Sequence, residues 1–359
     1  MRSFHSIITG YGSYIPEEVI SNADFIKNKF YNASGERLEK PTEDIIEKFQ
    51  QITEIEKRRH VGDNLVTSDI GFFAAREALA FGDTDKETLD YIIVAHNFGD
   101  VVSVGSAPIL VPSIAAKIKF KLGIKNPDTV AYDILFGCPG WLQALIQADY
   151  FIKSGRAKKI LVVGAEVLSR VSDPHDIDSM IYSDGAGAVV VEAVRGRKQV
   201  GILYHKTRSD TFKHSQLLKI GLSYNPLYSN QANFLKMDGK KLYEYALNHV
   251  PEAIQECIDH CGLKITDIKK ILIHQANAKM LNSILSRLYK LYGKKLSPLD
   301  IMPLTISNLG NSSVATLPTL FDLLMKGELK TDPLKKGDHV VFASVGAGMN
   351  INAMIYKMP

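Results

Sequence analysis

The sequence predicts an α/β protein built from two similar halves, and two observations lead to this prediction. Short apolar segments rich in β-branched residues alternate with amphipathic segments of helical period along the whole chain. From about residue 198 the order of these segments begins again. We therefore expect an N-terminal half over residues 1–197 and a C-terminal half over residues 198–359, packed face to face.

Composition and charge are those of an ordinary globular protein. The 359 residues are 45% hydrophobic and 23% charged, which is enough to bury a large core. The net charge of +4 is mild and the basic residues are scattered, so nucleic-acid binding is not predicted, and docking of an acidic protein is the alternative role for the basic residues.

The cysteines and the termini indicate a cytoplasmic protein. Cys138, Cys257 and Cys261 are too few for a disulfide framework, and their spacing does not indicate a metal site. The first residues lack the apolar core of a signal peptide, and no uncharged apolar run reaches the length of a membrane span. We expect no membrane association, no metal and no cofactor.

The predicted elements of the first half follow local signals. Residues 24–60 are charged and partly helical, and their last five residues are interpreted as a solvated surface run. Ser68 is expected to cap the helix that follows it, because its side chain can accept hydrogen bonds from free N–H groups. Predicted strands are 6–12, 89–96, 158–168 and the glycine-led 181–192, and a further helix is predicted over 108–122.

The second half repeats this order. A strand at 199–208 corresponds to the first strand, and a long helix at 242–261 corresponds to the first long helix. The strand that ends on His274 corresponds to the one that ends on His96. Cys138 then aligns with Gly310 or Asn311, and Gly155 aligns with Gly327.

Three polar residues follow the ends of predicted strands. Cys138, His274 and Asn311 all lie just past such ends, where ligands bind in α/β sheets. If the two halves pack about a pseudo-twofold axis, these ends meet. Residues far apart in sequence are thereby predicted to be neighbours.

Cys138 lies in a tight turn between a strand and a helix. The turn Gly-Cys-Pro-Gly places the thiol at a helix start, where free N–H groups and the helix dipole favour thiolate and lower a cysteine pKa. A nucleophile is one interpretation. A small buried core residue is the other, because free cysteine is among the most buried residue types.

These residues together resemble the β-ketoacyl-acyl carrier protein synthase III family of the thiolase superfamily. The likeness runs from residue 6 to residue 356 and includes Cys138 in its glycine turn, HQAN at 274–277, GNSS at 310–313, SDGAGA at 183–188 and SVGAG at 344–348. It implies a thiolase-like fold of five layers, αβαβα, and a homodimer. It also implies a Cys138–His274–Asn311 triad and an oxyanion hole made by the backbone N–H groups of Cys138 and Gly348.

The chemistry of the three side chains fits this implication. A thiolate is a strong nucleophile for thioester exchange. Two neutral donors, His274 through a ring N–H and Asn311 through its amide, suit the stabilisation of a developing enolate oxygen. Asn308 is a rival to Asn311, with loop capping as the alternative for both. His96 is interpreted as structural, and Cys257 and Cys261 as packing residues.

Further residues are assigned to substrate and partner contacts. On the predicted helix 278–295, Met280, Ile284, Leu288 and Leu291 face the core. Its basic face includes Lys279, Arg287, Lys290 and Lys294, and it is either a solvated face or a docking site for an acidic acyl carrier protein, a role that the family resemblance places near Lys279. Val111 and Trp141 are expected to line the acyl pocket. Val111 stands where the family commonly has a large aromatic residue, and its smaller side chain leaves room for a longer acyl chain.

The sequence therefore predicts a condensing acyltransferase that uses acyl thioesters of an acyl carrier protein or coenzyme A. The coenzyme A mouth of the family carries a tryptophan and an arginine, which residues 47–60 lack at the expected place. This favours a specialised ketosynthase that joins two carrier-bound chains, of the dialkylresorcinol or pyrone type, as an alternative. A non-condensing acyltransferase and an idle binding subunit are further alternatives, and an intact triad argues against idleness.

Overall fold

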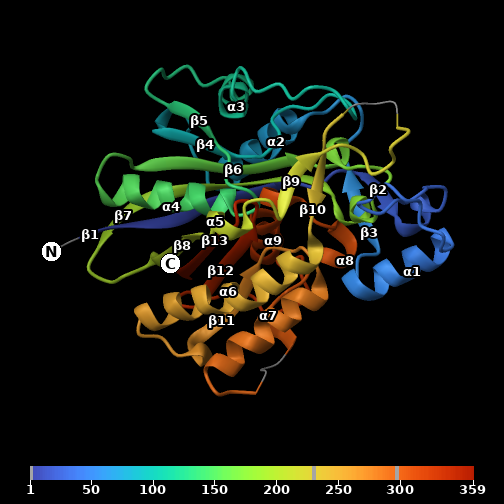
Figure 1. Ribbon diagram of the computed structural model, residues 1–359. Coiled ribbons are helices and arrows are strands. Elements are labelled where there is room, and N and C mark those ends of the chain that lie inside the picture. The colour runs from blue at the N-terminus through green and yellow to red at the C-terminus, as the bar shows by residue number, and fades with distance from the viewer. Residues whose placement is uncertain (1–2, 229–231, 296–298) are drawn as a thin grey trace.

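The computed structural model describes residues 3–228, 232–295 and 299–359, which form five stacked layers of helices and sheets (Figure 1). Two sheets form the second and fourth layers, and helices fill the layers outside and between them. The predicted α/β class with its αβαβα arrangement is confirmed. Among the described residues, no helix combines the length and the apolarity that crossing a membrane requires.

The first sheet has five strands in the order β1-β7-β6-β4-β5. Its strands are β1 (Ser3–Tyr14), β4 (Tyr91–Ala95), β5 (Val130–Ile134), β6 (Lys159–Val167) and β7 (Asp184–Gly196). Ala95 of β4 lies opposite Ile134 of β5 and Gly164 of β6, so β4 and β5 end together and the parallel β6 continues to Val167.

The second sheet repeats the first with one strand fewer. Its order is β11-β12-β13-β8, formed by β8 (Gly201–Ser209), β11 (Ile268–Ile273), β12 (His339–Gly346) and β13 (Asn350–Lys357). β12 runs parallel to β11 and antiparallel to β13, as β6 runs parallel to β4 and antiparallel to β7. The duplication predicted from the sequence is thus confirmed in strand order and direction.

Helices from each half cover equivalent faces. The outer layers contain α2 (Thr67–Phe81) and α3 (Ile114–Leu122) on the first sheet, and α6 (Gly239–His260) and α7 (Ala278–Leu291) on the second (Figure 1). The central layer contains α4 (Gly140–Lys153) and α9 (Thr316–Met325). Both central helices end before a glycine with positive φ, Gly155 at 75° and Gly327 at 73°, the pair that the repeat aligned.

Smaller elements surround the strand ends at one side of these layers. They are β2 (Glu18–Ser21) paired with β3 (Lys57–His60), α1 (Thr42–Thr53), β9 (Leu218–Gly221) paired with β10 (Phe234–Met237), α5 (Thr211–His214) and α8 (Ile306–Leu309). They lie on the right-hand side and over the middle of Figure 1.

Two predictions about local structure in the first half are wrong. The basic run at 56–60 is not solvated throughout: Arg58 in β3 is fully buried and donates to the carbonyl oxygen of Met180 and to Asn22 Oδ1, at 2.6 and 2.7 Å. A guanidinium can be buried here because polar acceptors surround its flat fork of donors. Ser68 does not cap α2, because it lies inside the helix and donates to the buried carboxylate of Asp100.

Two helix boundaries also differ from the prediction. α3 begins at Ile114, after a Ser113 side chain that accepts from Ala116 N–H, so residues 108–113 are loop. α7 ends at Leu291, whose side chain is exposed, whereas Met280, Ile284 and Leu288 are buried as predicted. The end of the predicted helix includes Lys294 and Lys295, which the structure places outside α7.

Candidate active site

Cys138 lies in the turn between β5 and α4, where loops from the two halves meet. Gly137 has a φ of 64°, and a Cβ there would lie 2.6 Å from the backbone nitrogen of Ala347. A Cβ on Gly346 would likewise lie 2.5 Å from the backbone nitrogen of Cys138. Only glycine fits both positions, so the two glycine turns hold the cysteine by mutual close approach.

Cys138, His274 and Asn311 line one cavity of about 210 Å³. The pairing of two strands brings His274 and Cys138 close together. Ile273 of β11 pairs with Ala343 of β12, and β12 leads into the glycine turn that lies against Cys138. The rest of the wall is mainly apolar, with side chains from β9 and β10 over one side (Leu218, Ile220, Leu235, Met237). The three residues that the repeat predicted to be neighbours therefore share a cavity.

The expected lowering of the Cys138 pKa is wrong. Burial disfavours the charged thiolate and raises the pKa of the Cys138 thiol to about 11, although the Ser313 hydroxyl, 3.5 Å from Sγ, acts in the opposite direction. The nearby carboxyl group of Glu166 also favours the neutral thiol. The thiol is only partly exposed, and its desolvation outweighs the helix start on which the sequence prediction rested.

His274 is buried at the end of β11, and its backbone N–H donates to the carbonyl oxygen of Ala343 at 2.9 Å. Burial lowers the pKa of its imidazole to about 4. The ring is therefore neutral near pH 7 and has one N–H to donate. Gln275 fixes the segment after it, by donating to the carbonyl oxygen of Ile273 and accepting from Thr305 N–H.

Asn311 is held by hydrogen bonds at both its backbone and its side chain. Its N–H donates to the carbonyl oxygen of Ile181 and its carbonyl accepts from Ser183 N–H. Its Oδ1 accepts from Ser313 N–H at 2.8 Å, which leaves the amide Nδ2 as the group available to a ligand. The rival Asn308 is exposed on α8 and does not line the cavity.

Two residues assigned to the acyl pocket lie elsewhere. Trp141 is fully buried on α4 and packs against Phe342, so it belongs to the core between the sheets. Val111 is 85% exposed in the loop before α3 and does not line the cavity. Nothing in the sequence indicated which way the side chains of Trp141 and Val111 point.

The structure also shows what surrounds His96, Cys257 and the glycine turn at residues 346–348. His96 is buried and its ring nitrogens contact Asp133 and the backbone N–H of Gly99, in agreement with a structural role. Cys257 is buried in α6. Gly346 and Ala347 line the cavity, and Gly348 is the next residue of the same turn.

A wider funnel of about 1070 Å³ adjoins the cavity and shares Met237, Leu242, Ala276, Met280 and Asn311 with it. One wall is α1, which contributes Lys48, Phe49 and Ile52, and the start of α6 contributes Lys240 and Tyr243. Lys279 and Arg287 are exposed on α7, and Lys279 precedes the shared Met280. The basic face of α7 therefore begins beside the funnel.

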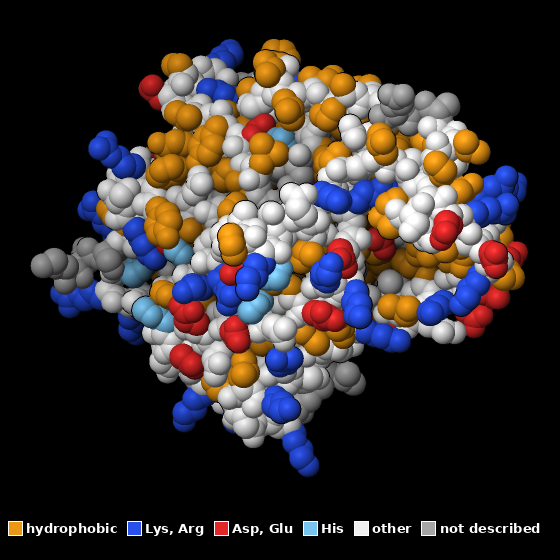
Figure 2. Space-filling view, in the orientation of Figure 1, with side chains coloured by type: hydrophobic (Ala, Val, Ile, Leu, Met, Phe, Trp, Pro, Cys, Tyr) orange, Lys and Arg blue, Asp and Glu red, His pale blue; other side chains and the backbone are white. Residues whose placement is uncertain are grey.

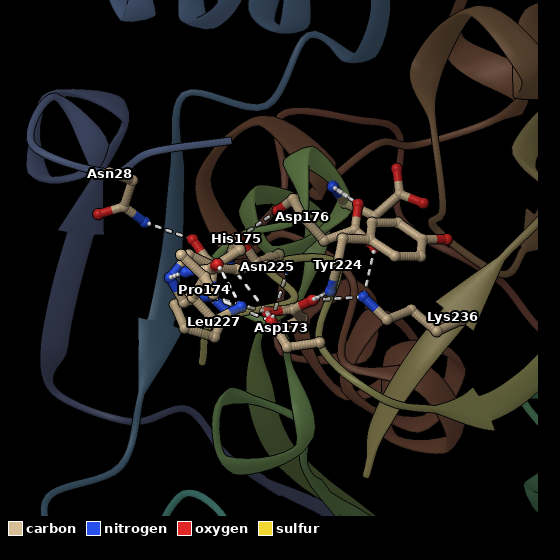
Figure 3. A network of polar contacts seen from close by, with 12 residues as sticks. Asn28, Asp173, Pro174, His175, Asp176, Tyr224, Asn225, Leu227 and Lys236 are labelled. Carbon is tan, nitrogen blue, oxygen red and sulfur yellow. Dashed lines mark hydrogen bonds and ion pairs between the residues drawn. The ribbon is translucent and has the colours of Figure 1, made fainter. Parts of the chain in front are cut away.

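A buried ion cluster anchors β10, which forms part of the cavity wall (Figure 3). Lys236 donates to Asp173 at 2.5 Å and to Asp176 at 3.1 Å, and it lies over the ring of Tyr224. Burial alone would raise the pKa of Asp173, but hydrogen bonds from Lys236 and from Tyr224 N–H hold it below its ordinary value. The cluster fixes β10 to the loop between β6 and β7.

This cluster and a second one beside Cys138 were not predicted from the sequence. Asp173 lies between two predicted strands without a motif around it, and an isolated lysine in β10 gives no signal of burial. Beside the cysteine, Asn97 contacts Ser313 and the buried carboxylate of Glu166. Burial raises the pKa of Glu166 to about 7. A glutamate inside an apolar strand, as in KKILVVGAEVL, was the available signal.

Comparisons with known proteins agree with this architecture. Residues 132–211 match the family model described as 3-oxoacyl-[acyl-carrier-protein (ACP)] synthase III, and residues 258–358 match the model of its C-terminal part. The β-ketoacyl-[acyl-carrier-protein] synthase III of Ehrlichia canis is 32% identical over 98% of this chain and 99% of its own. That of Staphylococcus haemolyticus is 32% identical over 98% of both.

Solved structures give the same result. The synthase III of Thermus thermophilus aligns with a TM-score of 0.79 and 30% identity over 98% of this chain and 99% of its own. The priming β-ketosynthase of the R1128 polyketide pathway, at 24% identity over 99% of this chain and 97% of its own, shares the fold with a TM-score of 0.80. The chain therefore belongs to the 3-oxoacyl-[acyl-carrier-protein] synthase III family of condensing enzymes, in the thiolase superfamily.

Proposed function

We propose that this protein is a cytoplasmic condensing acyltransferase that loads an acyl group on Cys138 and joins it to an acyl thioester of an acyl carrier protein. The observation that carries this proposal is the shared cavity. One thiol and two neutral hydrogen-bond donors, Cys138, His274 and Asn311, line a buried apolar space that adjoins a funnel. This set suits acyl transfer followed by stabilisation of an enolate.

In the first step the sulfur of Cys138 attacks the carbonyl carbon of the incoming thioester. The backbone N–H groups of Cys138 and Gly348 form the oxyanion hole for the tetrahedral intermediate. The new bond joins the Cys138 sulfur to the acyl carbon, and the bond from that carbon to the sulfur of the carrier breaks. The carrier leaves as a thiol with the proton that Cys138 has lost, so one thioester replaces another.

In the second step a carrier-bound malonyl group supplies the carbon nucleophile. Loss of CO₂ leaves its bonding electrons on the adjacent carbon as an enolate, whose oxygen accepts hydrogen bonds from His274 and Asn311 Nδ2. This carbon attacks the acyl carbonyl, and Cys138 leaves as thiolate. A neutral imidazole suits this role, because it donates a hydrogen bond and does not protonate the enolate outright.

Loading is tested by weighing the intact protein after incubation with panels of acyl-coenzyme A and acyl-carrier thioesters. We expect a mass increase equal to one acyl group, removed by hydroxylamine and located by peptide mapping at Cys138. Condensation is tested by adding malonyl-carrier protein and following CO₂ and the β-keto product. A protein that takes no acyl group from either panel would contradict the proposal.

A specialised ketosynthase that joins two carrier-bound chains is the second candidate. It is favoured by the funnel wall, because the described residues that line it include lysines but no arginine or tryptophan. Arg58, which follows α1 in β3, is buried against Met180 and is not available to a coenzyme A phosphate. Loading from acyl-carrier substrates alone would support this candidate, and loading from acyl-coenzyme A would support the first.

We propose that the carrier protein docks on the basic face of α7. Lys279 and Arg287 are exposed on this helix, which begins beside the funnel, and an acyl carrier protein is acidic. Replacing both with glutamate is expected to raise the apparent KM for carrier-linked substrates by roughly tenfold, since each exposed pair contributes up to about 1 kcal/mol. Small thioesters should react unchanged.

Lys336→Glu is the matched control for this docking surface. Lys336 is exposed just before β12, at the opposite end of the strand from the cavity, so its reversal changes net charge without touching α7. Equal effects of this control and of the α7 variant would show that only net charge matters. Unchanged kinetics for both substrates would remove the docking proposal.

We also propose that the protein is a homodimer that pairs through the β5 edge. β5 is the last strand of its sheet, and exposed apolar side chains surround it, including Leu110, Val111, Val130 and Leu135. Figure 2 shows hydrophobic side chains gathered on this side of the molecule. An open strand edge with such neighbours is suited to cover by a second copy. Light scattering should give twice the 39.8 kDa of the chain.

A further inference from the structure

We propose that Ser313 donates a hydrogen bond to the thiolate of Cys138, and that Asn97, held by Glu166, keeps the Ser313 hydroxyl turned toward the sulfur. This inference rests on the proposed function, in which Cys138 is the nucleophile. It adds Ser313 as a catalytic residue that touches the reacting atom, and Asn97 as a positioning residue that acts through it. The resemblance by sequence assigned no role to these residues.

The direction of the hydrogen bond follows from the donors present. Ser313 Oγ lies 3.5 Å from Cys138 Sγ and 3.2 Å from Asn97 Nδ2. An amide nitrogen only donates, so the Ser313 oxygen must accept from Asn97. The single hydroxyl proton of Ser313 is then free to point at the sulfur.

Glu166 determines which way the Asn97 amide faces. Glu166 Oε2 accepts from Asn97 Nδ2 at 2.6 Å, and Oε1 accepts from the Asn97 backbone N–H at 3.2 Å. Above pH 7, where Glu166 is ionised, a flipped amide would bring its oxygen against this carboxylate, so the orientation with Nδ2 toward Glu166 and Ser313 is favoured. Glu166 is itself fully buried on β6, beside β4, which leads into Asn97.

Ser313 is also fixed from its backbone side. Its N–H donates to Asn311 Oδ1 at 2.8 Å, and its φ of 53° belongs to the left-handed region, which serine adopts rarely. One short segment thus places the amide of Asn311 at the cavity and the hydroxyl of Ser313 at the sulfur. The turn conformation serves both groups together.

The surroundings of Cys138 show why such a donor matters. The titratable groups near its thiol are Glu166 on β6, Tyr182 before β7 and His274 after β11, and none of them is a cation near pH 7. A buried thiolate without a donor is strongly disfavoured. A hydrogen bond to an ionised acceptor is about twice as strong as one between neutral groups, so the Ser313 donor favours the thiolate over the thiol.

The test is the pH dependence of Cys138 alkylation by iodoacetamide, followed by peptide mass spectrometry on the full protein. Alkylation requires thiolate and does not require condensation. Ser313→Ala is expected to move the midpoint upward by about one pH unit, which is a roughly tenfold loss of thiolate. Ser312→Ala is the matched control, because the Ser312 hydroxyl contacts Thr316 and not the sulfur.

Asn97→Ala provides a second variant and a test of positioning. Without Asn97 the Ser313 hydroxyl can rotate, so a smaller upward shift is expected. The double variant should shift no further than Ser313→Ala alone, because Asn97 acts only through Ser313. Thermal unfolding of each variant checks folding, and Asn97→Ala carries the test if Ser313→Ala does not fold.

The outcomes separate this inference from the proposed function. Identical alkylation profiles for the wild type, Ser313→Ala and Asn97→Ala would overturn the inference, even while Cys138 still loads acyl groups. Additive shifts in the double variant would overturn the role of Asn97. A shifted profile in a protein that never loads an acyl group would support the hydrogen bond and contradict the proposed function.

Discussion

Replacing Cys138 with serine is expected to abolish acyl loading and to lower condensation by at least about 10³-fold, since removal of a covalent nucleophile in other enzymes costs on the order of 10⁶-fold. A hydroxyl is a far weaker acid than a thiol. Among the described residues, no base is hydrogen-bonded to this position, because the contact to Sγ comes from the Ser313 hydroxyl. Serine would therefore stay protonated and unreactive. Intact-protein mass after incubation with the best acyl donor measures the loading.

Cys261→Ser is the control for this variant. Cys261 is a free, half-buried cysteine just after α6 and away from the cavity, so its loss should leave loading unchanged. An acyl group that still appears on Cys138→Ser, or that disappears from Cys261→Ser, would show that the nucleophile has been misassigned.

Alanine at His274 or at Asn311 is expected to lower condensation by about 10²- to 10³-fold each, the usual effect of removing one donor to a developing oxyanion. Loading of Cys138 should persist in both variants, because the proposed first step uses the backbone N–H groups instead. Comparing acyl-enzyme mass with product formation separates the two steps. A variant that loses loading and condensation equally would contradict the division of roles.

Asn308→Ala is the matched control for Asn311→Ala. The two asparagines lie three residues apart, but Asn308 is exposed on α8 and Asn311 lines the cavity. Normal condensation is expected from the control. An equal loss in both variants would mean that the effect comes from the loop and not from the amide at the cavity.

The imidazole of His274 also predicts a pH dependence. Its pKa is lowered by burial to about 4, against about 6.5 in an unfolded chain. Between these values the unfolded state binds the proton and the folded state does not, so His274 makes the free energy of unfolding fall as pH decreases from about 6.5 to 4. Above pH 6.5 this contribution is constant. His274→Phe should flatten this part of a urea-unfolding series, and an unchanged series would contradict a buried neutral ring.

The sequence was sufficient for the fold and for the positions of the three polar residues at the cavity. The internal repeat of the sequence predicts the topology, because a duplicated order of elements indicates a duplicated order of strands. The repeat alone thus aligns Cys138 with the region of Asn311. The choice between Asn308 and Asn311 depended on local turn residues, and the structure places Asn311 at the cavity.

Side-chain direction and burial were not predictable in the same way. Trp141 lies three residues after Cys138, yet the helix turns it into the core beside Phe342. Arg58 lies in a run of charges, yet carbonyl groups of distant segments surround it. The prediction of a lowered Cys138 pKa failed for a related reason. A helix start is visible in the sequence, whereas the desolvation of a side chain is not. Such properties depend on which distant segments pack together.

The matched strand ends of the two halves also have a chemical consequence. Exact twofold symmetry would place two identical groups at the cavity, either two thiols or two amides. Two thiols would tend toward oxidation and would offer only weak donors to a carbonyl oxygen, whereas two amides would offer no nucleophile. Under the proposed function, Cys138 at one end supplies electrons to the acyl carbonyl of the first substrate, and Asn311 at the other end donates a hydrogen bond to the enolate oxygen of the second. The two nearly symmetric halves thus contribute different groups, and the cavity contains both a thiol and an amide donor, which neither half supplies alone.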